Sequence, residues 1–131
     1  IAALGNGDVS NIQILNNEYS GGNFIIAGDS DRQDPILRKN WIVKGNVRTN
    51  WFGSPMASSS FFHIENILFE SNSDQVSSQQ KRNSIIFDKC SGEIKVTNNN
   101  FYGGKYIQLR DMESDDVILK GNEPEQIKVK I

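Results

Sequence analysis

The sequence predicts an all-β protein in which short strands stack in five successive repeats. One six-residue pattern recurs five times: an apolar residue, any residue, an apolar residue, any residue, a small residue and an asparagine. The closing asparagines are 29, 26, 27 and 23 residues apart, a spacing found in solenoid proteins. They are Asn17, Asn46, Asn72, Asn99 and Asn122. The alternation of apolar and polar residues is typical of a half-buried strand and opposes a helix. We therefore expect a solenoid of about five rungs.

Two positions inside each copy support this prediction. The positions five and three residues before the asparagine are apolar in every copy: Ile12, Ile14, Trp41, Val43, Ile67, Phe69, Ile94, Val96, Val117 and Leu119. The position directly before the asparagine is always small or turn-forming: Asn16, Gly45, Ser71, Asn98 and Gly121. Such residues suit a left-handed backbone or a bulge beside a tight bend. Each copy thus predicts a strand that faces a core and then bends.

A second series of apolar segments follows the bends and predicts the next strand of each rung. These segments are residues 24–26, 61–62, 85–87, 106–109 and 127–131. Three longer stretches, residues 28–35, 48–60 and 73–83, separate some of the predicted strands. We expect them to be surface loops, because the repeat resumes in step after each one. An antiparallel β-sandwich is the alternative fold, although the two-residue Asn-Gly turns of hairpins are missing.

Composition limits the classes of function. The chain has 131 residues, which fits a single domain, 1–131, and it starts at Ile1 and not at Met, so we expect part of a longer protein. It carries 14 Lys and Arg against 16 Asp and Glu, a net charge of −2 without a basic block, which argues against nucleic acid as a partner. No apolar run approaches the roughly 20 residues that span a bilayer, so membrane insertion is not expected. The single cysteine, Cys90, follows an apolar run and is expected to be a small buried residue.

The copies NIQILNNEYSGG and EIKVTNNNFYGG resemble repeats of the right-handed parallel β-helix of pectate lyases, polygalacturonases and phage tailspikes. The resemblance covers about residues 11–131. It implies a single-stranded right-handed parallel β-helix whose asparagines form a ladder, since a buried amide can bond the rungs above and below. Three copies depart from it: Arg48, Asp74 and Pro124 stand where Tyr19 and Phe101 follow the other asparagines. The resemblance further implies a polysaccharide or oligosaccharide partner, a homotrimer, no required cofactor, and a place outside the cell or on a virion surface.

Two carboxylates are candidate catalytic residues. An alignment of the second strands on Ile64, Phe87 and Leu109 places Glu65 and Asp88 one rung apart, about 5 Å, which is near the carboxylate separation of a retaining glycosidase. They would then serve as acid and nucleophile. The alternative is a solvated row whose acids are balanced by Arg110 and Lys89.

Two loops contain other candidate site residues. Asp29, Asp31 and Asp34 could gather oxygens around calcium, or could form Asx turns before Pro35. Candidate sugar platforms are Trp51 and Phe52, in the second long stretch and outside the apolar columns, together with Tyr102 and Tyr106 on either side of Gly103-Gly104. Trp51 could equally cover its own loop.

A row of residues four positions before each asparagine is expected to face outward: Gln13, Ile42, Leu68, Lys95 and Ile118. Its apolar members predict a patch that another chain or the protein's own loops would cover.

Two functions follow from these observations. The first is recognition of a cell-surface polysaccharide, with depolymerisation as a further step, in a phage tail or bacterial surface protein. The alternative is a structural spacer or trimerisation module without a ligand.

Overall fold

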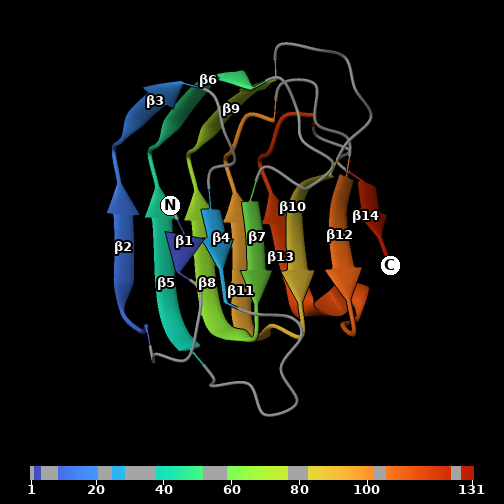
Figure 1. Ribbon diagram of the computed structural model, residues 1–131. Coiled ribbons are helices and arrows are strands. Elements are labelled where there is room, and N and C mark those ends of the chain that lie inside the picture. The colour runs from blue at the N-terminus through green and yellow to red at the C-terminus, as the bar shows by residue number, and fades with distance from the viewer. Residues whose placement is uncertain are drawn as a thin grey trace.

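The protein is an all-β chain of three parallel sheets (Figure 1). The computed structural model describes residues 2–3, 9–20, 25–28, 38–51, 59–76, 83–101, 106–124 and 128–131. Sheet A contains β1 (Ala2–Ala3), β4 (Ile25–Ala27), β7 (Ser59–Phe62), β10 (Asn83–Asp88), β12 (Tyr106–Arg110) and β14 (Lys128–Lys130). Sheet B contains β2 (Ile12–Leu15), β5 (Arg38–Lys44), β8 (Ile64–Glu70), β11 (Ser91–Thr97) and β13 (Val117–Lys120). Sheet C contains β3 (Glu18–Ser20), β6 (Val47–Trp51) and β9 (Ser73–Val76).

The strands of each sheet come from successive repeats of the sequence. From β2 onward the chain visits sheets B, C and A in that order, and beyond β9 sheet C continues as single bridges at Asn100 and Glu123. A short 3₁₀ helix, η1 (Ser114–Asp116), leads into β13. Every strand pairing in the described part of the chain is parallel, so the antiparallel sandwich is wrong as an alternative.

The predicted apolar columns are confirmed and form the core. In sheet B, Ile14, Val43, Phe69, Val96 and Leu119 lie in one register row. Eight of the ten predicted residues are buried, and Ile12 and Leu119, on the outermost strands of the sheet, are partly buried. Phe61 of sheet A lies opposite and contacts three aromatic rings, with a centroid distance of 5.5 Å to Phe87. Each such side chain stabilises the fold by roughly 1.5–3 kcal/mol.

The predicted bends are also confirmed. All five residues before the anchoring asparagines have positive φ, from 53° at Asn16 to 68° at Gly45. Two further rows of positive φ mark the other corners of the chain. One row contains Asn11, Asn40, Asn66 and Gly92, and the other contains His63, Lys89 and Asp111. Asparagine and glycine are the residues that adopt this conformation most readily, so the corners follow from composition at most of these positions.

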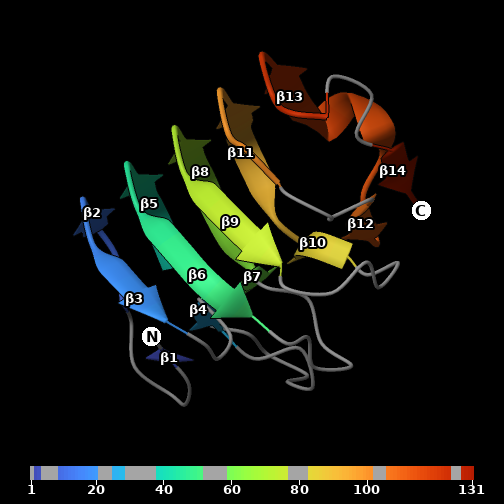
Figure 2. The ribbon, with the colours of Figure 1, turned by 90° about the horizontal axis from the view of Figure 1, so that it is seen from above.

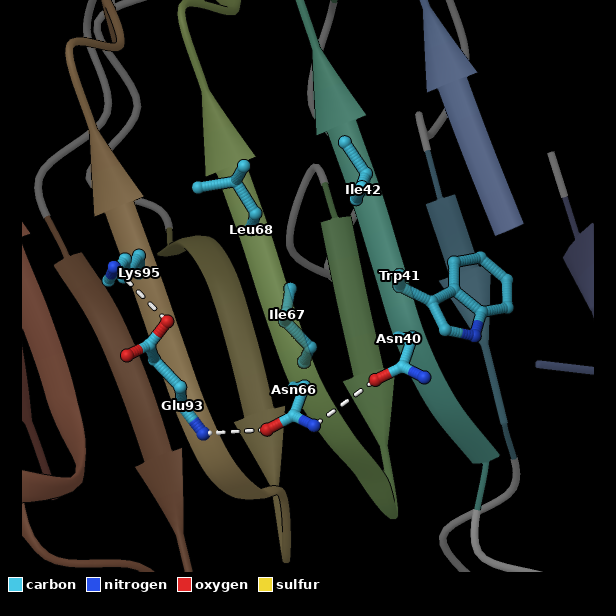
Figure 3. Close-up of a pocket in the computed structure, with 8 residues that line it drawn as sticks. All are labelled: Asn40, Trp41, Ile42, Asn66, Ile67, Leu68, Glu93 and Lys95. Atoms are coloured by element: carbon cyan, nitrogen blue, oxygen red, sulfur yellow. Dashed lines mark hydrogen bonds and ion pairs between the residues drawn. The ribbon is translucent and has the colours of Figure 1, made fainter. Parts of the chain in front are cut away.

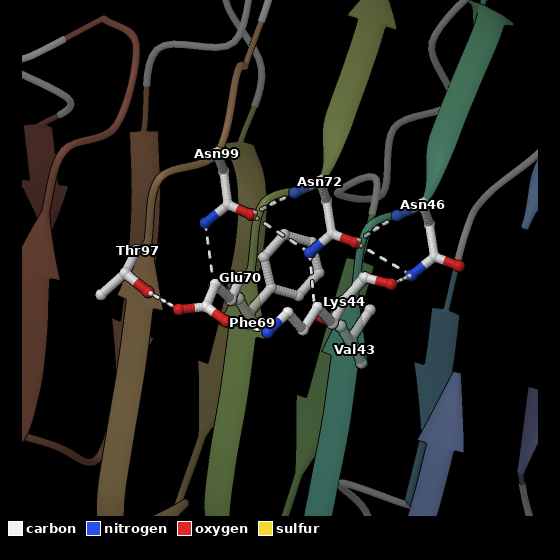
Figure 4. A network of polar contacts seen from close by, with 8 residues as sticks. All are labelled: Val43, Lys44, Asn46, Phe69, Glu70, Asn72, Thr97 and Asn99. Carbon is white, nitrogen blue, oxygen red and sulfur yellow. Dashed lines mark hydrogen bonds and ion pairs between the residues drawn. The ribbon is translucent and has the colours of Figure 1, made fainter. Parts of the chain in front are cut away.

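The five anchoring asparagines form one continuous hydrogen-bonded row, and Figure 4 shows its middle members, Asn46, Asn72 and Asn99. Asn46 donates its backbone N–H and its Nδ2 to Oδ1 of Asn72, at 3.0 and 2.9 Å, and also donates Nδ2 to the carbonyl of Ile14. The same pattern repeats from Asn72 to Asn99 and from Asn99 to Asn122. These four side chains are buried, and the row satisfies amide groups that water cannot reach.

Replacing Asn99 by Ala should destabilise the fold by about 2–4 kcal/mol. The change leaves the backbone N–H and one Nδ2 hydrogen of Asn72, and the carbonyl of Phe69, without these partners in a buried place. Urea unfolding followed by circular dichroism measures the difference.

The neighbouring asparagine is the matched control. The Asn100 side chain is partly exposed and makes none of these bonds, so Asn100→Ala should change the unfolding free energy by less than about 0.5 kcal/mol. Equal effects of the two substitutions would contradict the role given to the row.

A charged pair occupies the interior beneath sheet C. Arg48 and Asp74 lie in register on β6 and β9, and Arg48 Nε donates to Asp74 Oδ1 at 2.7 Å. The two side chains are 1% and 9% exposed. These are two of the positions where the sequence departs from the aromatic pattern, and Phe101, which keeps it, is also buried. At these two positions the chain therefore buries an ion pair where Phe101 buries an aromatic ring.

Asp74→Asn should destabilise the protein by about 3 kcal/mol, because Arg48 would keep its charge in the interior without its carboxylate partner. Glu65→Gln provides the comparison, since Glu65 pairs with Lys39 at 3.5 Å on the surface and its loss should stay within about 0.5 kcal/mol. Thermal unfolding of both variants distinguishes the buried pair from the exposed one. An Asp74→Asn protein as stable as Glu65→Gln would be inconsistent with this assignment.

The described residues include no helix long and apolar enough to cross a membrane.

Candidate functional site

The outer face of sheet B carries an open groove of about 240 Å³ that crosses strands β5, β8 and β11 (Figure 3). In Figure 2 no element of the described part of the chain lies over this face. The groove is lined by Asn40, Trp41, Ile42, Asn66, Ile67, Leu68, Glu93 and Lys95. Trp41 and Ile67 direct their side chains into the core and contribute little to the surface, since they are only 1% and 2% exposed.

One side of the groove is an apolar row. Ile42 and Leu68 lie side by side on adjacent strands, followed in register by Lys95 and then by Ile118, which is 49% exposed. This is the outward row expected from the sequence, and its register is confirmed. Ile42 and Leu68 are partly exposed, so they offer an apolar surface to whatever enters the groove.

The other side is a row of amides. Asn66 donates Nδ2 to Oδ1 of Asn40 at 3.1 Å, and Asn40 donates Nδ2 to Oδ1 of Asn11 at 3.0 Å. Oδ1 of Asn66 accepts the backbone N–H of Glu93 at 2.9 Å. The row exists because the chain turns with positive φ at each of these asparagines. Sequence reasoning missed it, although an Asn directly before the first apolar residue in three copies was the signal: Asn11-Ile12, Asn40-Trp41 and Asn66-Ile67.

Gly92 occupies the next position of this row, where a side chain would not fit. Gly92 has φ of 70°, and a Cβ at that position would overlap Oδ1 of Asn66. The same relation holds in the corner beside the buried row, where Gly45 lies against Asn16 and Gly121 against Asn98. An asparagine at a corner thus lies over a glycine of the next repeat in three places.

Ion pairs surround the apolar row. Lys39 and Glu65 lie 3.5 Å apart, Lys44 and Glu70 2.9 Å apart, and Glu93 and Lys95 3.1 Å apart. A hydrogen bond from Lys44, together with its positive charge, holds the pKa of Glu70 below its ordinary value. Glu70 therefore stays ionised at neutral pH.

The predicted catalytic pair is not brought together. Asp88 lies in sheet A, in register with Phe62 and Arg110, whereas Glu65 lies in sheet B, in register with Lys39 and Ser91. The alignment that placed them one rung apart is wrong, because the chain turns at His63, with φ of 54°, and ends β7 at Phe62. The true equivalent of the His63 corner is Lys89, one residue after Asp88.

The other predicted site residues lie apart from the groove or outside the described residues. Tyr106, partly exposed, begins β12 in sheet A and is in register with Asn83 and Lys128. Trp51 ends β6, and its side chain lies outside the described part of the structure. Phe52 and Tyr102, together with the candidate calcium ligands Asp29, Asp31 and Asp34, also lie outside the described residues.

The described part of the chain contains neither a metal-binding cluster nor a reactive thiol. Those residues include no group of three or more His, Cys, Asp or Glu side chains that could hold a metal ion. Cys90 is buried as expected, and burial raises the pKa of its thiol to about 12, so the thiol is protonated at neutral pH.

The comparisons with protein-family models, with curated proteins and with solved structures find no match to this chain.

The contact between Asn66 and Gly92 can be tested by a double-mutant cycle. Gly92→Ala should destabilise the protein by about 2–3 kcal/mol, partly through the positive φ and partly through overlap with the Asn66 side chain. In an Asn66→Ala background the overlap with the amide is gone, and the backbone strain and a close contact with the Glu65 side chain remain, so the same change should cost about 1–2 kcal/mol. Purely additive unfolding free energies would show that the two residues do not interact.

Proposed function

We propose that the chain is a segment of a right-handed parallel β-helix of about five rungs that recognises a linear polysaccharide. The fixed order of sheets B, C and A supports the β-helix, as does the parallel pairing of each strand with its equivalent in the next repeat. The hydrogen-bonded row of five asparagines, four of them buried, agrees with the ladder that the resemblance to pectate lyases and tailspikes implies.

The observation that carries the proposed recognition is the pairing of two unlike rows along one groove. Sugar rings present apolar C–H faces and hydroxyl edges, and here Ile42 and Leu68 lie beside the amides of Asn40 and Asn66. Neighbouring strands are roughly 4.8 Å apart, close to the length of one sugar residue in an extended chain. A glycan running across β5, β8 and β11 would meet an equivalent pair of contacts at two successive strands.

The resemblance indicates where such a protein would act, and the positions of Glu65 and Asp88 limit the activity that we propose. A segment of this kind would belong to a phage tail or bacterial surface protein and act outside the cell or on a virion surface. Depolymerisation, which the resemblance also implies, loses its support because Glu65 and Asp88 lie in different sheets. The proposal is therefore confined to recognition.

A second candidate function is a structural spacer or trimerisation module. The partly exposed apolar row, with Ile118 at its end, is the observation that favours it, since a second copy of the chain could cover the same face of sheet B.

Leu68→Thr should weaken glycan binding about tenfold, because it removes apolar surface from the middle of the groove while keeping strand propensity. Leu15→Thr is the matched control: Leu15 is exposed on β2 of the same sheet and lies outside the groove, so its loss should leave binding unchanged. A glycan array identifies the ligand, and calorimetry measures the affinity.

Light scattering separates the two candidate functions. A monomer that binds oligosaccharide supports recognition. A trimer that binds no glycan, and that Leu68→Thr dissociates, would instead support the structural module.

A further inference from the structure

We infer that the groove selects an uncharged glycan over an acidic one. This inference deepens the proposed recognition of a polysaccharide and rests on it. It is carried by the pairing of the charges around the groove and by the hydrogen-bonding groups that remain open along the amide row.

The charges at the groove are already neutralised within the chain. Lys95, the cation that lines the groove, is held by Glu93 of the same strand at 3.1 Å. Beside the groove, Lys39 is paired with Glu65 and Lys44 with Glu70. Three ammonium groups thus face three carboxylates, so the charges of these six residues sum to zero.

An acidic sugar would be opposed at this surface. Its carboxylate could reach Lys95 either beside Glu93 or in place of Glu93, and in both positions it would lie next to the carboxylate of Glu93. Opposite charges at a surface gain little, and like charges repel by a similar amount. Either position therefore offers no net attraction to an acidic chain.

The amide row matches hydroxyl groups better than carboxylates. Asn40 and Asn66 each use one of two Nδ2 hydrogens and accept one hydrogen bond at Oδ1. One Nδ2 hydrogen and one Oδ1 lone pair therefore remain on the exposed side chain of Asn40 and on the partly exposed side chain of Asn66. A sugar hydroxyl can donate and accept at once, whereas an ionised carboxylate can only accept. A row that offers both kinds of site at successive strands fits a polyhydroxylated neutral chain.

The test compares two oligosaccharides of equal length, a neutral glucose hexamer and a galacturonate hexamer, by calorimetry at low and high sodium chloride. The neutral hexamer should bind with an affinity that changes less than about twofold with salt, since no charge is neutralised on binding. The galacturonate hexamer should bind at least about tenfold more weakly. Tighter, salt-sensitive binding of galacturonate to the unmodified protein would overturn the inference.

Glu93→Gln provides the variant. It frees Lys95 from its partner, so the affinity for galacturonate should rise about fivefold relative to the affinity for the neutral hexamer, and galacturonate binding should become sensitive to salt. Glu18→Gln makes the same change of charge on β3, in sheet C, and should alter neither affinity. Unchanged galacturonate binding in Glu93→Gln would contradict the role given to the Glu93–Lys95 pair. Failure of both hexamers and of every glycan on an array to bind would overturn the proposed function itself.

Discussion

In-register parallel pairing between successive repeats is the constraint on which this structure depends. Because each strand lies beside its equivalent from the next repeat, a residue meets the residue at the same position one repeat away, except where a bulge shifts the register, as in β11. An apolar residue then meets an apolar residue, and a buried asparagine meets another asparagine that can accept its hydrogens. A buried amide is ordinarily destabilising, yet here the repeat satisfies it. The core, the corners and the groove all follow from that one alignment.

Most of the fold could be predicted because its signal is local and repeated. The asparagines fix a reference point in each copy, and the apolar alternation and the left-handed corner lie at fixed distances before it. The second strands have no such reference point, because segments of different length separate them from the asparagines. Two of these segments, 48–60 and 73–83, were expected to be surface loops, but they contain residues of β6 and β9 of sheet C. Their corner residues, His63, Lys89 and Asp111, share no chemical type. The alignment of Glu65 with Asp88 failed there, and a catalytic pair was predicted from a register that does not exist.

The groove was predictable only in part. Its apolar row follows from the alternation of β5 and β8, since residues between two inward positions must face outward. The amide row depends on a second set of corner residues, in which the first three repeats have an asparagine. The fourth repeat has Gly92 instead, and a bulge in β11 moves this glycine one residue further from the first apolar residue of its strand. A repeated position whose residue type and distance from the strand both change in the fourth repeat is difficult to recognise from the sequence alone. The pairing of Lys95 with Glu93, two residues apart on one strand, likewise depends on side-chain geometry that the sequence does not specify.

The contact of a corner asparagine with a glycine in the next repeat makes the order of the repeats matter. Asn16 is followed by Gly45, and Asn98 by Gly121, whereas Ser71 follows a glycine. If Ser71 were placed directly after Asn98, its Cβ would occupy the space that the amide oxygen requires. The repeats are therefore not interchangeable modules, although they share one pattern. Because one repeat supplies a glycine at one corner and an asparagine at another, copying a single repeat can place a residue with a Cβ against a corner asparagine, so such a chain lengthens most easily where each copied asparagine meets a glycine.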